Sequence, residues 1–106
     1  MAMGLPMSGN FVDFRKLQQQ ALPYLPAIVH RLLPGGCVEG REYVSRNPRR
    51  ADRRPGSFKV NLITGKWADF AAGVSGGDAA SLVAYLLGVS QSEAAAWLLK
   101  AIGGAA

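Results

Sequence analysis

The spacing of apolar positions predicts helices in the first third of the chain. Apolar residues recur every three or four positions over Val12–Ala21, with Asn10 or Asp13 as the candidate N-cap and the glutamines Gln18 to Gln20 on the solvent side. A second helix is predicted over Pro26–Leu33, because proline suits the first helical turn and a Pro-Gly-Gly sequence follows.

Two further helices are predicted towards the C-terminus. Asp78 is a suitable N-cap for a helix that continues to Leu87 and stops at Gly88. The sequence Ser-Gln-Ser-Glu at 90–93 has the form of a capping box and predicts the start of the last helix. Both helices carry an apolar stripe, so we expect them to pack as a helical hairpin across the apolar face of a sheet.

The middle of the chain alternates with a period of two, which is the pattern of strands. Phe58, Val60 and Leu62 alternate with polar residues, and after a Thr-Gly turn the chain continues from Trp67 to Phe70, which predicts a hairpin. A further strand is predicted around Tyr43 and Val44, with the Tyr43 ring packed inside, and a short fourth one near Cys37. The glycine-rich segment 71–77 is expected to be a connector.

The predicted fold class is therefore α+β, with a small antiparallel sheet of three to four strands packed with two N-terminal and two C-terminal helices. At 106 residues, about half of them apolar, the chain is long enough for one domain with one modest core. We expect a mobile segment over 1–10 and a single domain over 11–106. This domain divides into a helical lead-in (11–36), a sheet with a basic loop (37–77) and the helical hairpin (78–103).

Positive charge is concentrated between Gly40 and Asp78. The chain has a net charge of +5, and eight of its twelve basic residues lie in this stretch, which favours a polyanionic partner. Prolines and glycines interrupt it, so we expect an exposed loop over 47–56 whose arginines bind phosphate oxygens; the alternative is a solvated loop that only keeps the domain soluble. The candidate nucleic-acid-binding cations are Arg41, Arg46, Arg49, Arg50, Arg53, Arg54, Lys59 and Lys66.

Trp67 is the last candidate for nucleic-acid binding, and two interpretations of it are open. If Trp67 shares the outer face of the hairpin with Lys59 and Asn61, its ring can stack on unpaired bases. The alternative is that it packs in the core.

The sequence contains no recognisable catalytic constellation. His30 has no nucleophile or carboxylate near it in sequence, and Cys37 is expected to be a buried apolar side chain at a strand start. A single cysteine excludes an internal disulfide and fits a reducing compartment, and no apolar run approaches the ~20 residues of a membrane-spanning helix. We therefore expect a cytoplasmic, non-enzymatic protein without a membrane partner.

Several short motifs occur in a familiar order between Gly40 and Leu99. They are Gly-Arg-x-Tyr at 40–43, Arg-Pro-Gly-Ser-Phe at 54–58, a hairpin that ends in an aromatic residue, and Gly-Gly-Asp at 76–78, which opens a helix. This order resembles the zinc-ribbon domain at the N-terminus of bacterial and phage DNA primases, in the degenerate form found in primase or primase-helicase proteins of phages, plasmids and integrated elements. The resemblance implies a module that contacts single-stranded template DNA during replication, while nucleotidyl transfer belongs to a separate downstream domain.

The chain departs from that family at the zinc ligands. The positions that match three cysteines and a histidine hold Asn47, Arg50, Asp69 and Ala72 or Gly73. Tetrahedral zinc takes thiolates or imidazoles, so we expect no zinc and no other cofactor. A polar substitute is expected instead, in which Asp69 pairs with Arg50 or a neighbour and Asn47 bonds to the backbone.

Two functions from different classes remain at this point. The first is a non-catalytic module of a mobile-element primase that binds single-stranded DNA. The second is a protein-interaction module whose arginines meet an acidic surface of a replication partner, such as a helicase or polymerase domain.

Overall fold

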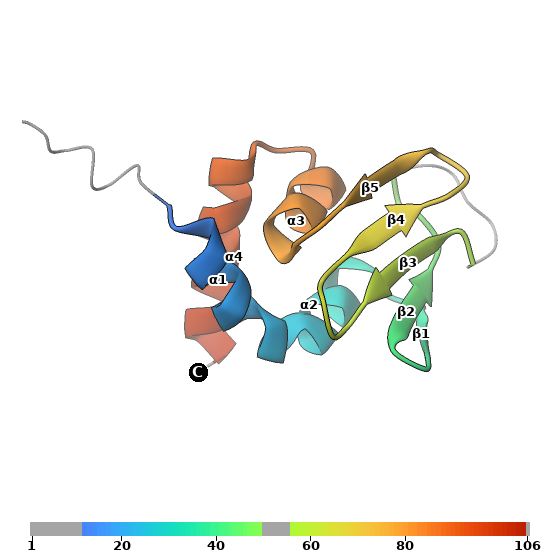
Figure 1. Ribbon diagram of the computed structural model, residues 1–106, viewed down its shortest axis with the longest axis horizontal. Coiled ribbons are helices and arrows are strands. Elements are labelled where there is room, and N and C mark those ends of the chain that lie inside the picture. Colours follow the sequence, from blue (N-terminus) through green and yellow to red (C-terminus); the bar gives the residue numbers. More distant parts are fainter. Residues whose placement is uncertain (1–11, 50–55, 106) are drawn as a thin grey trace, which may run out of the picture.

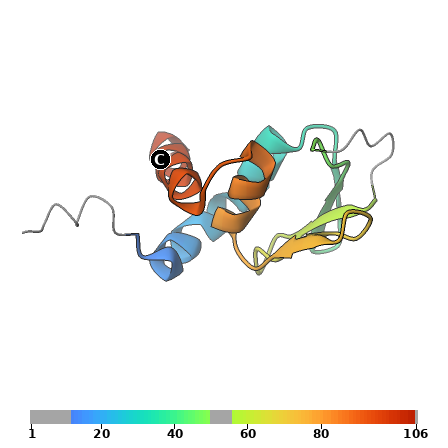
Figure 2. The ribbon, with the colours of Figure 1, turned by 90° about the horizontal axis from the view of Figure 1, so that it is seen from above.

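A computed structural model describes residues 12–49 and 56–105 of the chain. The N-terminal segment 1–10 and three of the predicted cations, Arg50, Arg53 and Arg54, lie outside the described residues. The fold is α+β, as predicted, with helices at one end of the molecule and an antiparallel sheet at the other (Figures 1 and 2).

The N-terminal helices form close to the predicted positions. Helix α1 spans Phe14–Ala21, and Asp13 caps it by accepting a hydrogen bond of 3.1 Å from the Lys16 N–H. A 3₁₀ turn, η2 (Leu22–Tyr24), leads directly into α2 (Leu25–Leu32), which has proline in its first turn.

The C-terminal helices are α3 (Ala79–Leu87) and α4 (Gln91–Ala105). Asp78 caps α3 and Gly88 ends it in the left-handed conformation, with φ +68°. The capping box of α4 is confirmed, because the Glu93 N–H donates to Ser90 Oγ at 3.1 Å and the Ser90 N–H donates to Glu93 Oε1 at 3.0 Å.

The helix pair α3 and α4 forms a corner rather than a closely antiparallel hairpin. The chain bends by 107° between them. Within the described residues, no single helix is long and apolar enough to cross a membrane, and this pair reaches that length and composition only when its two bent halves are counted together.

The sheet has five strands in sequence order, which is more than the three to four predicted. They are β1 (Cys37–Glu39), β2 (Glu42–Ser45), β3 (Phe58–Asn61), β4 (Trp67–Asp69) and β5 (Val74–Gly76), and all neighbours are antiparallel. The extra strand, β5, lies in the glycine-rich segment that we expected to be a connector. It pairs with β4 from Trp67↔Gly76 to Asp69↔Val74, and Gly76 lies so close to the Trp67 indole that a Cβ at this position would clash with it.

One core joins the inner face of the sheet to the helices. Phe58 and Val60 on β3 belong to the same buried cluster as Val29 of α2, Leu82 of α3 and Leu98 of α4. Tyr43 packs inside, as predicted, and its hydroxyl donates to the Leu33 carbonyl at 2.7 Å. Cys37 was predicted to be buried and is exposed instead, because it lies on the edge strand β1.

Gln18 is a second correction, since we placed it on the solvent side of α1. Its side chain donates to the Thr64 carbonyl and accepts from the Ala79 N–H, both at 2.9 Å. It therefore joins α1 to the β3–β4 turn and to the first residue of α3.

Candidate nucleic-acid interface

The register of the sheet decides which side chains face outward. Val60 lies opposite Trp67, and Lys59 lies opposite Ala68. Because directly opposed residues share a face, Trp67 lies on the inner face with Val60, whereas Lys59 and Ala68 lie on the outer face.

The prediction that Trp67 stacks on bases is therefore wrong, and its alternative, core packing, describes the residue. Trp67 is 5% exposed and its ring centroid lies 5.7 Å from that of Phe58 and 5.2 Å from that of Tyr85. Its indole N–H donates to Ser81 Oγ at 3.0 Å. The protein itself covers this ring, so no face is available for a base.

Phe70 is the aromatic residue that the outer side of the sheet presents. Its side chain is 72% exposed, and it lines a shallow hollow of about 180 Å³. We did not single it out, although the alternation along β4 carries the signal: Trp67 and Asp69 are buried, so the residue after Asp69 faces outward. The residues around the hollow are Glu42, Lys59, Asn61, Lys66, Trp67, Ala68 and Phe70.

The predicted cations of the described part do not form one cluster but are spread along the sheet. Arg41 precedes β2 and Arg46 follows it, so they lie at opposite ends of the strand. The Leu62 N–H donates to the Arg41 carbonyl at 2.8 Å, which places Arg41 at the same end of the sheet as the β3–β4 turn and Lys66. Lys59 lies between these ends on the outer face.

Four of these cations have neither an ion-pair partner nor a side-chain hydrogen bond among the described residues. They are Arg41, Arg46, Lys59 and Lys66. Arg41, Arg46 and Lys66 are exposed and Lys59 is half-buried. One acid, Glu42, shares the hollow with the two lysines and would oppose an anion there.

Arg49 differs from the other cations, because its guanidinium group is held by the fold. Its Nη1 donates to the Tyr85 carbonyl at 2.8 Å, near the end of α3, and its Cζ lies 5.5 Å from the centre of the Tyr85 ring. A positive side chain at a helix C-terminus is favourable. Arg49 therefore has a structural role that the sequence did not indicate.

A polar junction joins the base of the loop to the sheet and to α3. Asn47 Nδ2 donates to Asp69 Oδ2 at 2.6 Å and to the Tyr85 hydroxyl at 2.8 Å. We predicted that Asn47 bonds to the backbone, and its Oδ1 does accept from the Arg49 N–H at 2.8 Å. The predicted partner of Asp69, Arg50, lies outside the described residues; among the described side chains, Asn47 and Ser57 bond to Asp69.

Asp69 also organises the chain that follows it. Its Oδ1 accepts from the N–H groups of Ala71 and Ala72 at 3.0 and 3.2 Å. Three of the positions matched to zinc ligands, Asn47, Asp69 and Ala72, thus meet at one point. Within the described residues, no group of three or more His, Cys, Asp or Glu side chains could hold a metal ion.

The junction holds Asp69 in its ionised form. Burial raises the pKa of Asp69, but hydrogen bonds from the Asn47 amide, the Ala72 N–H, the Ser57 side chain and the Ala71 N–H together outweigh it and bring the pKa below its usual value. The carboxylate is fully buried. It is therefore a structural anion and not a proton donor.

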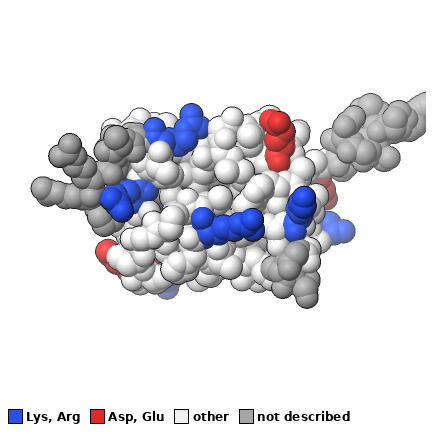
Figure 3. Space-filling model, turned by 180° about the vertical axis from the view of Figure 1, so that it is seen from behind, with Lys and Arg blue, Asp and Glu red and all other residues white. Residues whose placement is uncertain are grey.

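The surface opposite to that of Figure 1 is also more basic than acidic. Figure 3 shows Lys and Arg side chains in several separate groups across this face, with few Asp and Glu between them. The basic side chains on this face thus form separate groups and not one continuous patch.

No family model, no curated protein and no solved structure matches the chain. A function must therefore be inferred from the outer face of the sheet, the cations along it and the polar junction beneath the loop.

Proposed function

We propose that this chain is a non-catalytic module that binds single-stranded DNA, and that it is the degenerate zinc-ribbon-like domain of a mobile-element DNA primase. The observation that carries the DNA-binding proposal is the exposed ring of Phe70 on a sheet face that also presents Lys59 and Lys66. Single-strand-binding surfaces combine such aromatic platforms with cations that follow the phosphate backbone.

The cations at the two ends of the sheet extend this surface. A strand that crosses the outer face would pass from Arg41 and Lys66 at the turn end, over Lys59, to Phe70 and Arg46 at the loop end. Arg46 and Arg41 can each present a guanidinium fork to phosphate oxygens, since neither has an ion-pair partner among the described residues.

The assignment to the primase family is supported by the polar junction. Asn47 lies 22 residues before Asp69 in the sequence, and the fold brings it into contact with Asp69, which also bonds to the nearby Ala72; all three positions match metal ligands in the resemblance. An amide and a carboxylate would here replace the bonds that a zinc ion makes in the relatives.

The test is a salt titration of binding to a fluorescently labelled single-stranded oligonucleotide, measured by anisotropy. The logarithm of the binding constant is expected to fall linearly with the logarithm of the salt concentration. For single strands this slope is negative, and its magnitude decreases by about 0.7 for each phosphate contact that is lost. The variant Lys59→Gln/Lys66→Gln should therefore bind more weakly and show a shallower slope.

Lys16→Gln is the matched control, because Lys16 is an exposed lysine on α1 that does not belong to the sheet or line its hollow. It should leave both the affinity and the slope nearly unchanged. If the wild-type chain does not bind the oligonucleotide even at low salt, or if Lys16→Gln weakens binding as much as the double variant, the outer face is not the DNA-binding surface. A failure to bind would favour an acidic protein partner for the same cations.

A further inference from the structure

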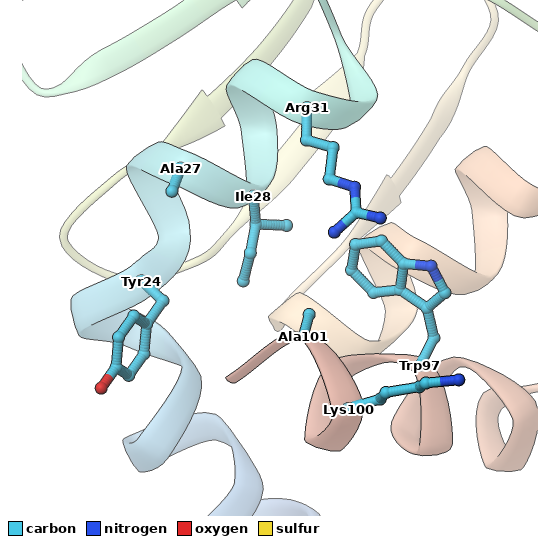
Figure 4. A pocket seen from close by; sticks show the side chains of 7 residues that line it. All are labelled: Tyr24, Ala27, Ile28, Arg31, Trp97, Lys100 and Ala101. Carbon is cyan, nitrogen blue, oxygen red and sulfur yellow. The ribbon is translucent and has the colours of Figure 1, made fainter. Parts of the chain in front are cut away.

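A cleft lies between the helices, on residues that the outer face does not share. It has a volume of about 470 Å³ and is lined by Tyr24 of η2, by residues of α2 and by residues of α4 (Figure 4). This volume is within the usual range of about 300–1,000 Å³ for ligand sites. The residues contributed by the two helices are Ala27, Ile28 and Arg31, and Trp97, Lys100 and Ala101.

The walls of the cleft are apolar and its rim is positive. Ile28 points into the space between the helices, and the short side chains of Ala27 and Ala101 leave it open (Figure 4). Arg31 reaches from α2 towards Trp97, with its Cζ 5.4 Å from the centre of the Trp97 ring. This contact spreads the guanidinium group along the apolar wall.

None of the described residues that line the cleft is acidic. Neither Arg31 nor Lys100 has an ion-pair partner in the part of the chain that the structure describes. The combination suits a partner that is both apolar and acidic, because it would cover the apolar wall and pair with the cations.

We propose that this cleft binds an acidic segment of a partner protein, which inserts one aliphatic or aromatic side chain between α2 and α4. The carboxylates that flank this side chain pair with Arg31 and Lys100. Arginine is suited to this contact, since its planar group binds a carboxylate with two parallel hydrogen bonds.

A protein segment fits the cleft better than a nucleic acid strand. A base could stack on Trp97 only in competition with Arg31, which already lies over that ring. The apolar lining suits an aliphatic or aromatic side chain, whereas a phosphate backbone would gain only from the two cations at the rim. The proposal does not depend on DNA binding by the outer face of the sheet.

The test uses the full chain and a displayed library of random short peptides, selected at physiological salt. Selected peptides are expected to share an aliphatic or aromatic residue flanked by Asp or Glu. One of them is then synthesised with a fluorescent label, and its affinity is measured for three variants. Arg31→Glu/Lys100→Glu should bind it at least about tenfold more weakly, because the charge complementarity is reversed.

The second variant, Ala27→Trp, keeps both cations and fills the cleft, and it should also lose at least about tenfold in affinity if the inserted side chain matters. The third, Arg15→Glu, is the matched control for charge, because Arg15 is an exposed arginine on α1 that does not line the cleft. It should bind the peptide like the wild type. Dispersed amide signals in an NMR spectrum confirm that each variant is folded.

Several outcomes overturn the proposal. These are selected peptides without acidic residues, no selected peptide at all, and equal binding by the charge-reversed variant and the wild type. A single-stranded oligonucleotide is the competing ligand. If Arg31→Glu/Lys100→Glu abolishes oligonucleotide binding while peptide binding is weak, the cleft belongs to a nucleic-acid surface instead.

Discussion

Asp69 is a fully buried carboxylate whose hydrogen bonds hold together the base of the loop, the end of β4 and the segment after it. Asp69→Ala removes one acceptor of the Asn47 amide and the side-chain acceptor of two backbone N–H groups. We expect a loss of about 2–4 kcal/mol in the free energy of unfolding, because hydrogen bonds to a charged group are strong and unpaired buried donors are costly. Urea denaturation measures this loss.

Asp69→Asn serves as the control for shape, since it keeps the side-chain volume and one acceptor oxygen. It should be less destabilising than Asp69→Ala. An unchanged urea midpoint for Asp69→Ala would show that the junction contributes nothing to stability.

The depressed pKa of Asp69 predicts how stability depends on pH. The carboxylate is ionised in the folded state at pH values where it would already bind a proton in the unfolded state. Its contribution is therefore complete above about pH 4, the ordinary pKa of an aspartate, and is lost as the pH falls through the lower folded-state pKa. Urea midpoints of the wild type and Asp69→Asn should accordingly converge on acidification below about pH 4, and a constant difference would contradict this.

The DNA-binding proposal predicts that Phe70 contributes directly to the affinity for single-stranded DNA. Stacking of a base on an aromatic side chain contributes about 1–3 kcal/mol, so Phe70→Ala should weaken binding of a single-stranded oligonucleotide by roughly fivefold or more. Stability should hardly change, because the ring is 72% exposed. Anisotropy titrations measure the affinity, with Leu99→Ala, an exposed apolar residue on α4, as the control.

Trp67 and Phe70 show what the sequence could and could not predict at a single position. Trp67 and Phe70 both follow the Thr-Gly turn beside basic residues, and composition does not distinguish them. Their faces depend on which residue of β3 lies opposite each, and the register Val60↔Trp67 is a long-range property of the folded sheet. The sequence therefore predicted the hairpin but left open which face Trp67 occupies, so Trp67 was named as a candidate for stacking and Phe70 was not.

At the scale of elements, the β3–β4 turn is fixed by a glycine that lies against α1. Gly65 is buried with φ +80°, and a Cβ there would come 2.5 Å from Gln18 Nε2. Gln18 cannot move away without breaking its bonds to Thr64 and Ala79. Gly65→Ala should therefore cost about 2–3 kcal/mol, the sum of left-handed strain and a lost hydrogen bond.

A variant at Gly73 measures the backbone strain without the contact with Gln18. Gly73 has φ +70°, but a Cβ added at this position would meet no atom of the described residues within 4 Å, apart from its own chain neighbours. Gly73→Ala should thus cost only the strain, about 1–2 kcal/mol. Equal thermal denaturation midpoints for the two variants would show that the contact with Gln18 is unimportant.

The capping residues, which can be recognised in the sequence, predicted where the helices begin. Asp13, Asp78 and Ser90 with Glu93 bond to backbone N–H groups within their own helices, so the sequence was sufficient to place these starts. Strand β5 has only three residues and exists through its pairing with β4, so nothing local indicated it. The contacts of Gln18 are also non-local, since they reach 46 and 61 residues along the chain.

At the scale of the whole molecule, the two proposed surfaces lie on different layers. The outer face belongs to the sheet, and the cleft belongs to η2, α2 and α4 (Figures 1 and 4). They have no lining residue in common. A nucleic acid strand and an acidic protein segment could therefore be bound at the same time, with the shared core as the rigid connection between them.

The junction of Asn47, Asp69 and Tyr85 has a further consequence for the rates of folding and unfolding. Asn47 is 22 residues from Asp69 and 38 from Tyr85, so the three meet only after both the sheet and α3 have formed. Tyr85→Phe, which removes one acceptor worth about 1 kcal/mol, should therefore speed unfolding roughly fivefold and leave the refolding rate almost unchanged in stopped-flow experiments. A slower refolding rate would instead place the junction in the transition state. On the expected outcome, these three side chains determine how long the folded module lasts rather than how quickly it is made.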